Sequence, residues 1–119
     1  MNKIDKFKIG IVGLGYVGLP LAVEFAKKYR TTGYDLNKNR ISELNNFIDS
    51  TLEINSDELK SVISHSENNS FKGLNLTTNT TDLSSCNTYI ITVPTPIDSE
   101  KKPDFSAVKS ATKTISQFV

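Results

Sequence analysis

The sequence is short of the residues that build disulfide frameworks and metal sites. Its 119 residues include one cysteine, Cys86, and one histidine. A single cysteine excludes an internal disulfide, and with one histidine it leaves no cluster of metal-ligand spacing. We therefore expect neither a disulfide-stabilised fold nor a metal site.

A strong charge bias and long apolar runs are missing as well. The chain carries 14 basic and 13 acidic residues without a basic cluster, which argues against nucleic acid or an anionic membrane as a partner. No apolar run approaches the ~18 residues of a membrane span, and the first residues lack the hydrophobic stretch of a signal peptide. We expect a soluble, cytoplasmic protein. The length is that of one domain, small for an enzyme with a separate substrate site.

What the sequence does contain is a glycine-rich turn between an apolar strand, 8–12, and a helix. Gly13, Gly15 and Gly18 have the spacing G-x-G-x-x-G. In this order, the three glycines suit a tight turn, close approach of the backbone to a pyrophosphate, and close contact between helix and strand. The first N–H groups of the helix and its dipole favour an anion. The pattern predicts a dinucleotide site.

Asp35 ends the next predicted strand, about 20 residues after the first glycine, where an acid binds the adenosine ribose hydroxyls. The alternative is that Asp35 only starts a turn or caps the next helix, because Asp-Leu-Asn is turn-like. A carboxylate beside the ribose would repel a 2′-phosphate by about 1–4 kcal/mol, roughly five- to a thousand-fold in affinity. We therefore expect NAD rather than NADP, a preference that Lys38 and Arg40 would soften.

Hydrophobic periodicity and turn signals predict alternating strands and helices. Val17 is expected on the buried side of the first helix, and Phe105 on that of the last, which Asp104 caps. Ser56 or Asp57 is the expected cap of the third helix. The predicted strands are 8–12, 31–35, 74–78 and 88–93; the predicted helices are 16–29, 38–46, 56–65 and one from Asp104 to Phe118, with a helical turn at 81–85. Right-handed crossovers then give an α/β fold of three layers around a parallel sheet with strand order 3-2-1-4.

Longer stretches carry a family resemblance. The segments Gly13-Leu-Gly-Tyr-Val-Gly-Leu-Pro-Leu-Ala22, Tyr34-Asp-Leu-Asn37 with Arg40-Ile41, Asp49-Ser-Thr-Leu-Glu53, and Ile90-Ile-Thr-Val-Pro-Thr-Pro96 with Pro103-Asp104 resemble the UDP-glucose/GDP-mannose dehydrogenase family. Within it, the sequence is most similar to the UDP-N-acetylglucosamine and UDP-N-acetylmannosamine 6-dehydrogenases of bacterial capsule, Vi-type and O-antigen polysaccharide biosynthesis. The resemblance covers essentially the whole chain. Phe47 departs from it, since a glycine is expected there in this branch.

The resemblance implies a Rossmann-like NAD-binding domain, of which residues 1–119 are the N-terminal part, truncated before the remaining strands. It also implies an oxidoreductase that converts the C6 hydroxyl of a UDP-N-acetylhexosamine to a carboxylate with two NAD+, using a cysteine that holds the intermediate. The resemblance implies that the catalytic and UDP-binding regions lie outside residues 1–119, so we expect no catalytic residue in this chain and no activity from it alone. Cys86 lacks the glycine-rich Cys-Pro-Lys surroundings of that cysteine and is expected to be a small buried residue.

The cofactor residues are expected in three places. Backbone N–H groups of the glycine turn would face the pyrophosphate, whereas the side chains of Tyr16 and Val17 either pack, as we expect, or contact the cofactor. Residues 93–95 end the fourth strand at the topological switch point, which in the family lies along the nicotinamide-side ribose; alternatively, the prolines only terminate the strand. Arg40 is expected either beside the adenine or on the helix surface, and Glu53 either near the site or in solvent. The full set is Gly13, Gly15, Tyr16, Val17, Gly18, Asp35, Arg40, Val93, Pro94 and Thr95.

Two other functions stay open at this stage. One is a regulatory module that binds a dinucleotide without turnover. The other is an interaction domain that binds no cofactor, which Asp35 together with the three glycines disfavours. In the predicted strand order, strand 88–93 forms a sheet edge whose unpaired N–H and C=O groups favour self-association of the chain.

Overall fold

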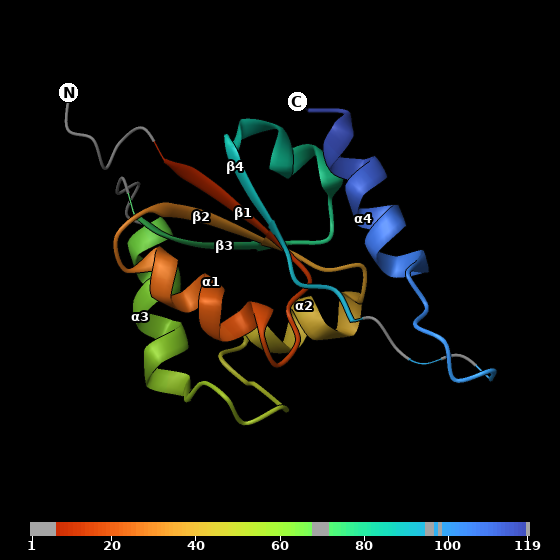
Figure 1. The fold of residues 1–119 in the computed structure, drawn as a ribbon. Coiled ribbons are helices and arrows are strands. Elements are labelled where there is room, and N and C mark those ends of the chain that lie inside the picture. Colours follow the sequence, from red (N-terminus) through yellow and green to blue (C-terminus); the bar gives the residue numbers. More distant parts are fainter. Residues whose placement is uncertain (1–6, 68–71, 95–96, 98, 119) are drawn as a thin grey trace.

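The computed structural model describes residues 7–67 (backbone only at 64–67), 72–94, 97 and 99–118 (Figure 1). These residues form a parallel sheet in the order β3-β2-β1-β4. The elements are β1 (Lys8–Val12), α1 (Gly18–Ala26), β2 (Arg30–Tyr34), α2 (Lys38–Asn45), α3 (Ser56–Glu67), β3 (Gly73–Thr77), the 3-10 helix η2 (Thr80–Ser85), β4 (Thr88–Ile91) and α4 (Ser106–Ser116). The predicted α/β fold and strand order 3-2-1-4 are confirmed.

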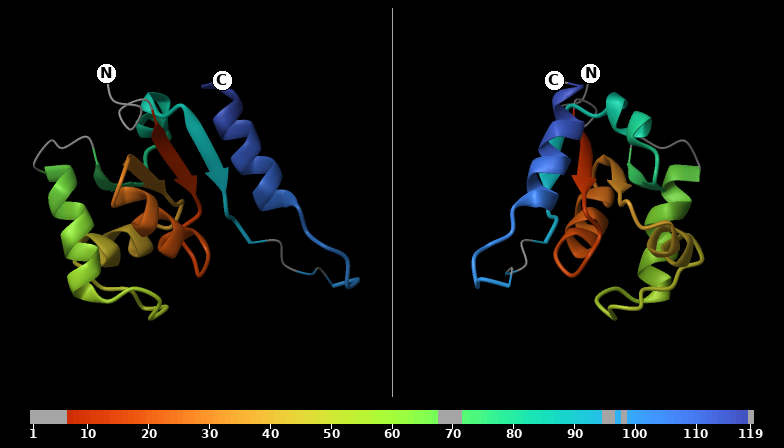
Figure 2. Two further views of the ribbon diagram at one scale, coloured as in Figure 1. Left: turned by 60° about the vertical axis from the view of Figure 1, so that its left-hand side comes forward. Right: turned by 90° about the vertical axis from the view of Figure 1, so that its right-hand side faces the viewer.

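Helices cover both faces of the sheet, which gives the three layers visible in Figure 2. Successive side chains of a strand point to opposite faces, and β1 shows this alternation. Ile9 and Ile11 join the core beneath α1, α2 and α3. Val12 joins a second cluster on the other face, with side chains of η2 and α4. Cys86 is buried in this second cluster, as predicted.

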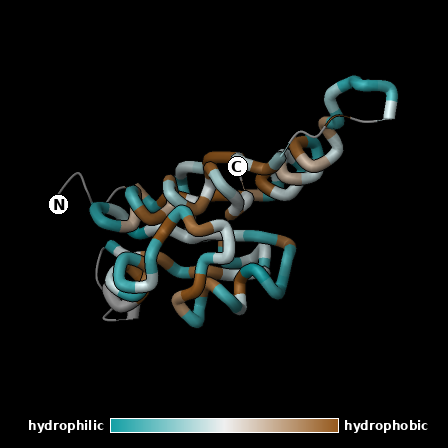
Figure 3. Tube along the Cα trace, turned by 90° about the horizontal axis from the view of Figure 1, so that it is seen from below, coloured by the Kyte–Doolittle hydropathy of each residue, from teal (hydrophilic) through white to brown (hydrophobic). Residues whose placement is uncertain are grey.

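The connection between β4 and α4 carries residues 99–105 away from the body of the molecule (Figure 2). Its tip is hydrophilic (Figure 3), and an isolated bridge pairs Ile97 with Pro103. This connection brings α4 back alongside β4, so that α4 closes one side of the carboxyl end of the sheet.

Helix α1 begins two residues later than predicted, and this changes which side chains are buried. Val17 precedes the helix and is 66% exposed, so the prediction that it packs inward was wrong. Phe105, just before α4, is 52% exposed and was also wrongly placed. Each residue lies outside the helical stretch whose periodicity was used to orient it.

None of the helices in the described part of the chain has the length and apolar character that a membrane span requires.

Two helix caps differ in detail from the prediction. The side chain of Asn55, rather than Ser56 or Asp57, accepts the N–H of Glu58 at 2.8 Å and caps α3. The Asp104 carboxylate accepts the N–H of Ser106 at 2.9 Å, so it does satisfy the start of α4. Strands also shift by a residue or two: β2 ends at Tyr34 and β4 at Ile91.

Phe47 takes the conformation in which glycine is favoured. Its φ is 64°, in the left-handed region. The N–H of Phe47 donates to the Leu44 carbonyl (2.9 Å) and that of Ile48 to the Glu43 carbonyl (3.0 Å), the two bonds of a Schellman ending to α2. The ring packs against the core, and Lys60 Nζ lies 5.9 Å from its centroid. Packing of the ring thus offsets the strain of a non-glycine residue.

Candidate functional site

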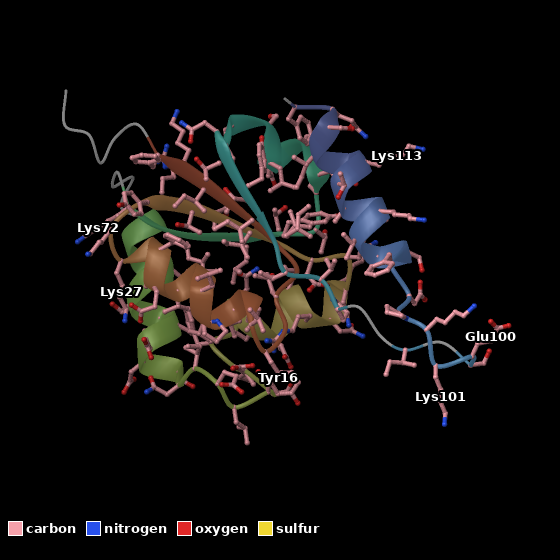
Figure 4. All side chains as sticks on the ribbon, in the orientation of Figure 1. Tyr16, Lys27, Lys72, Glu100, Lys101 and Lys113 are labelled. Carbon is pink, nitrogen blue, oxygen red and sulfur yellow. The ribbon has the colours of Figure 1, made fainter. Side chains whose placement is uncertain are left out.

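A groove of about 760 Å³ opens at the carboxyl ends of β1, β2 and β4. In Figure 4 this is the lower end of the sheet, where Tyr16 projects from the turn between β1 and α1. The groove is lined by Val12, Gly13, Leu14, Gly15, Tyr16, Val17, Tyr34, Asp35, Leu36, Asn37, Arg40, Thr92, Val93, Pro94, Ala107, Ser110, Ala111 and Thr114. Residues from both halves of the chain therefore meet at one end of the sheet.

The three glycines of the turn have three different surroundings. Gly13 has a φ of 102°, which other residues rarely adopt. A Cβ on Gly15 would meet no atom within 4 Å, so this position faces open space beside the groove. A Cβ on Gly18 would lie 1.8 Å from the Gly13 carbonyl oxygen, because α1 contacts the turn there. These surroundings match the tight turn, the open approach and the helix contact that the spacing predicts.

Side chains form hydrogen bonds to the two peptide units that flank Leu14. In the Gly13–Leu14 unit, the Leu14 N–H donates to Asp35 Oδ2 at 2.9 Å, and the Thr92 hydroxyl donates to the Gly13 carbonyl at 2.7 Å. In the Leu14–Gly15 unit, Arg40 Nε donates to the Leu14 carbonyl at 2.8 Å. The turn is thus fixed by one group from α2 and by two that directly follow β2 and β4, and not by its own sequence alone.

The next N–H groups are left free. Among the described residues, none accepts a hydrogen bond from the N–H of Gly15, Tyr16 or Val17. These groups precede α1, where the first N–H groups have no partner within the helix and the helix dipole is positive. The side chains of Tyr16 and Val17 are 69% and 66% exposed, so the expectation that they pack was wrong. The turn offers main-chain donors suited to an anion.

Asp35 points toward the glycine turn. One oxygen accepts the Leu14 N–H, and the other accepts the N–H of Asn37 at 2.9 Å. The second bond is the local turn that was the alternative interpretation of this residue. A carboxylate has about four acceptor positions, so both oxygens keep capacity for a hydroxyl donor from the groove. The turn role and a ligand role are therefore compatible.

Arg40 of α2 is largely covered by its neighbours, and the interpretation of it as a surface residue was wrong. Its side chain is 10% exposed. Besides Leu14, the guanidinium contacts Glu43 (2.6 Å) and Asp49 (2.8 Å) through Nη1. Burial lowers the pKa of Arg40, but the bonds to Asp49 and Glu43 outweigh it and raise the pKa above its ordinary value. Arg40 is a fixed cation at the side of the groove.

The remaining predicted residues divide into three groups. Val93 and Pro94 line the groove, whereas Thr95 lies outside the described residues. Gly18 lies beneath the turn against Gly13 and does not line the groove. Glu53 is exposed and does not reach the groove, which favours its interpretation as a solvated acid.

Helix α4 supplies one wall of the groove that we did not predict. The residues are Ala107, Ser110, Ala111 and Thr114. Their spacing of three and four residues puts them on one helix face, and all are small. Small residues at this spacing are the sequence signal for such a wall, whereas our prediction for this helix rests on the spacing of its apolar residues.

The described residues around the groove carry binding groups and few reactive ones. The ionisable side chains that line it are Asp35, Arg40, Tyr16 and Tyr34. Burial, with a smaller contribution from Asp35, raises the pKa of Tyr34, so its phenol is neutral at neutral pH. Cys86 is not among the lining residues, and burial raises the pKa of its thiol. The arrangement is suited to an anion and to hydroxyl groups, and these lining residues include no cysteine or histidine.

Comparison with known proteins identifies the family. The family model for the NAD-binding domain of the UDP-glucose/GDP-mannose dehydrogenase family matches residues 7–119. The UDP-N-acetyl-D-glucosamine 6-dehydrogenases of Pseudomonas aeruginosa and Salmonella typhi are 50% and 46% identical over 94% and 97% of this chain, which spans 24% and 25% of their lengths. A solved UDP-D-ManNAc dehydrogenase from Pyrococcus horikoshii superposes with a TM-score of 0.84 and 32% identity, over 94% of this chain and 26% of that one. The chain spans about a quarter of these relatives, and it belongs to the UDP-glucose/GDP-mannose dehydrogenase family as part of its NAD-binding domain.

Proposed function

We propose that the groove holds the ADP half of NAD+. The pyrophosphate lies at the free N–H groups of Gly15, Tyr16 and Val17, and the adenosine ribose hydroxyls donate to Asp35. The observation that supports this arrangement most directly is the turn itself: its two peptide units are held by Asp35, Thr92 and Arg40. Three N–H groups that no described residue accepts follow at the start of a helix. Such a site needs little reorganisation to bind an anion.

The remaining parts of the cofactor follow from the shape of the groove. Arg40 and the exposed Leu36 border the Asp35 end and would contact the adenosine. Val93 and Pro94 follow β4, which pairs with β1 at the point where the strand order of the sheet reverses, and they would lie along the nicotinamide-side ribose. The small residues of α4 leave room opposite the turn. When bound there, NAD+ supplies a hydride acceptor.

For the whole protein, we propose a nucleotide-sugar 6-dehydrogenase that oxidises the C6 hydroxyl of a UDP-N-acetylhexosamine to a carboxylate with two NAD+. The names of the relatives and their 46–50% identity to this chain support this substrate class. Similarity to the Staphylococcus aureus protein CapL, 40% identical over 93% of this chain, supports a role in capsule or related polysaccharide biosynthesis. Residues 1–119 would be the N-terminal part of the cofactor domain, in the cytoplasm. The alternative of a regulatory module gains no support from relatives that are named as dehydrogenases.

The cofactor proposal is tested by titrating the chain with NAD+ and NADP+ in a calorimeter. NAD+ should bind more tightly than NADP+. Asp35→Ala should weaken NAD+ binding about five- to a hundred-fold, because the ribose hydroxyls lose a charged acceptor. Glu53→Ala removes an exposed carboxylate that does not line the groove, and serves as the matched control. Equal NAD+ affinity in the Asp35→Ala and Glu53→Ala proteins would refute the ribose assignment.

The activity proposal needs a chain of the relatives' length. NADH formation from UDP-N-acetylglucosamine or UDP-N-acetylmannosamine, with two NADH per sugar, is the expected result for the longer protein. The 119-residue chain should produce none, because the residues that line its groove include no cysteine to hold the intermediate. NADH production by the 119-residue chain itself would contradict the proposal that activity requires the longer protein.

A further inference from the structure

Asp49 is a buried carboxylate outside the groove, and the roles assigned so far do not use it. Its side chain is 0% exposed. Oδ1 accepts from Arg40 Nη1 (2.8 Å), from the Thr51 N–H (3.0 Å) and from the Thr51 hydroxyl (2.6 Å). Oδ2 accepts the N–H groups of Glu53 (2.9 Å) and Ile54 (3.0 Å). One carboxylate thus orders the loop after α2 and also contacts the guanidinium that reaches the glycine turn.

A short chain of bonds leads from Asp49 to a free donor of the turn. Asp49 holds Arg40 Nη1, and Arg40 Nε holds the Leu14 carbonyl. In a trans peptide unit, the carbonyl and the following N–H point in opposite directions. Fixing the Leu14 carbonyl on Arg40 therefore fixes the Gly15 N–H on the opposite side of that unit.

Arg40 depends strongly on Asp49 for its orientation. Its Nη2 is buried without a hydrogen-bond partner among the described residues, so Nε and Nη1 alone orient the guanidinium. The other partner of Nη1, Glu43, has a side chain that is 26% exposed and is shared with the hydroxyl of Ser50. Asp49, with no exposure and four further bonds, is the rigid anchor of the pair.

We infer that Asp49 is a positioning residue for the anion site: through Arg40, it holds the Leu14–Gly15 peptide unit in the orientation that presents the Gly15 N–H to a pyrophosphate. This inference deepens the proposed function and rests on it. Asp49 itself touches no ligand, since it does not line the groove. It couples the loop after α2 to the glycine turn.

The direction in which Asp49→Asn changes the affinity for a pyrophosphate distinguishes a positioning role from a purely electrostatic effect. Asp49→Asn removes a negative charge from the neighbourhood of a site for an anion, so the Coulomb interaction alone would make pyrophosphate binding tighter. The positioning role predicts the reverse. An asparagine accepts through one oxygen only. If that oxygen stays on the loop, Arg40 loses its acceptor, and if it stays on Arg40, it is an uncharged and weaker acceptor; in both orientations Arg40 is held less firmly and the turn loosens.

The test is the affinity of ADP-ribose and NAD+ for the parent chain and for Asp49→Asn, by calorimetry. We expect binding to weaken about tenfold, the scale of one lost hydrogen bond to a charged group. Thr51→Val is the matched control, because it removes a bond to the same Asp49 oxygen from the same loop without touching Arg40. It should lower the midpoint of thermal unfolding and leave the affinity within about twofold of the parent.

Two further variants make the result decisive. In an Arg40→Met background, Asp49→Asn should produce no additional loss of affinity, since Asp49 acts through Arg40. Asp49→Glu keeps the charge but displaces the carboxylate by one methylene; it should also weaken binding, and it replaces Asp49→Asn if that variant fails to fold. The inference would be overturned if Asp49→Asn bound the ligands as tightly as the parent or more tightly. It would also be overturned if Asp49→Asn lowered the affinity in the Arg40→Met background by as much as it does in the parent. Absence of binding by the folded parent chain would instead overturn the proposed function, and this inference with it.

Discussion

A methyl group at Gly15 should weaken ligand binding without destabilising the fold. A Cβ there meets no atom within 4 Å, and no positive φ marks the position, so Gly15→Ala introduces neither a clash nor backbone strain. Replacement of glycine by alanine at a compatible position stabilises a protein by about 0.4–1 kcal/mol, because the unfolded chain loses freedom. The methyl group would, however, occupy space at the proposed pyrophosphate. Overpacking costs typically 1–3 kcal/mol, so NAD+ affinity should fall about 5- to 150-fold.

Gly18→Ala is the matched comparison within the same motif. Its Cβ would lie 1.8 Å from the Gly13 carbonyl oxygen and 2.4 Å from the Thr92 hydroxyl, so α1 must move away from the turn. We expect a loss of about 1–3 kcal/mol in the free energy of unfolding, despite the better helix propensity of alanine. Urea denaturation measures the stability of both variants, and calorimetry measures their affinity for NAD+.

The pair is informative because the two variants should fail differently. Gly15→Ala should unfold at the same or a higher urea concentration than the parent and still bind NAD+ poorly. If Gly15→Ala binds NAD+ as tightly as the parent, the pyrophosphate does not lie at this turn. If it unfolds at clearly lower urea, the space beside Gly15 is not open, and the reasoning from the backbone geometry is refuted.

Three further predictions concern the fold. Burial raises the pKa of Asp49, but the bonds from Thr51 and Arg40 outweigh it and lower the pKa from 3.8 to about 2. The ionised carboxylate therefore contributes about 2 kcal/mol to the free energy of unfolding above pH 4, and this contribution is lost as the pH falls toward 2. Urea titrations between pH 2 and 7 should show this loss in the parent and not in Asp49→Asn. Phe47→Gly should be about 0.5–1 kcal/mol more stable than Phe47→Ala, because both lose the ring but only glycine suits the φ of 64°; equal urea midpoints would argue against strain there. Since β4 lies at the edge of the described sheet, the 119-residue chain should self-associate, and a strictly monomeric profile in light scattering at high concentration would count against pairing through that edge.

Local patterns in the sequence predict the fold and the centre of the site. The glycine spacing, the apolar strand before it and the acid after the second strand are all short-range features, and they place the turn and Asp35 together correctly. Errors occur where helix boundaries decide the outcome. Val17 and Phe105 each lie just outside a helix, so the helical period used for them does not apply.

Arg40 shows that helical periodicity alone does not predict the burial of a charged side chain. Its position on α2 is typical of a solvated face, and its charge strengthens that expectation. The residue is largely covered because Leu14 and Asp49, 26 and 9 positions away, supply its acceptors. Such pairings depend on tertiary structure. The small residues of α4 form a wall for the same reason: the return of the chain beside β4, and not the helix itself, gives them a partner surface.

Because the proposed anion donors are main-chain amides, side-chain replacement at the donor positions leaves them in place. Tyr16 and Val17 project into solvent, so most substitutions there should be tolerated in a saturation mutagenesis screen, with proline the exception because it removes the N–H. Intolerance should instead concentrate at Gly13, Gly18 and Thr92, whose atoms shape the turn from beneath, and at Gly15, where any side chain would occupy the space proposed for the ligand. Apart from Gly15, the positions sensitive to mutation would thus differ from the positions whose atoms touch the ligand.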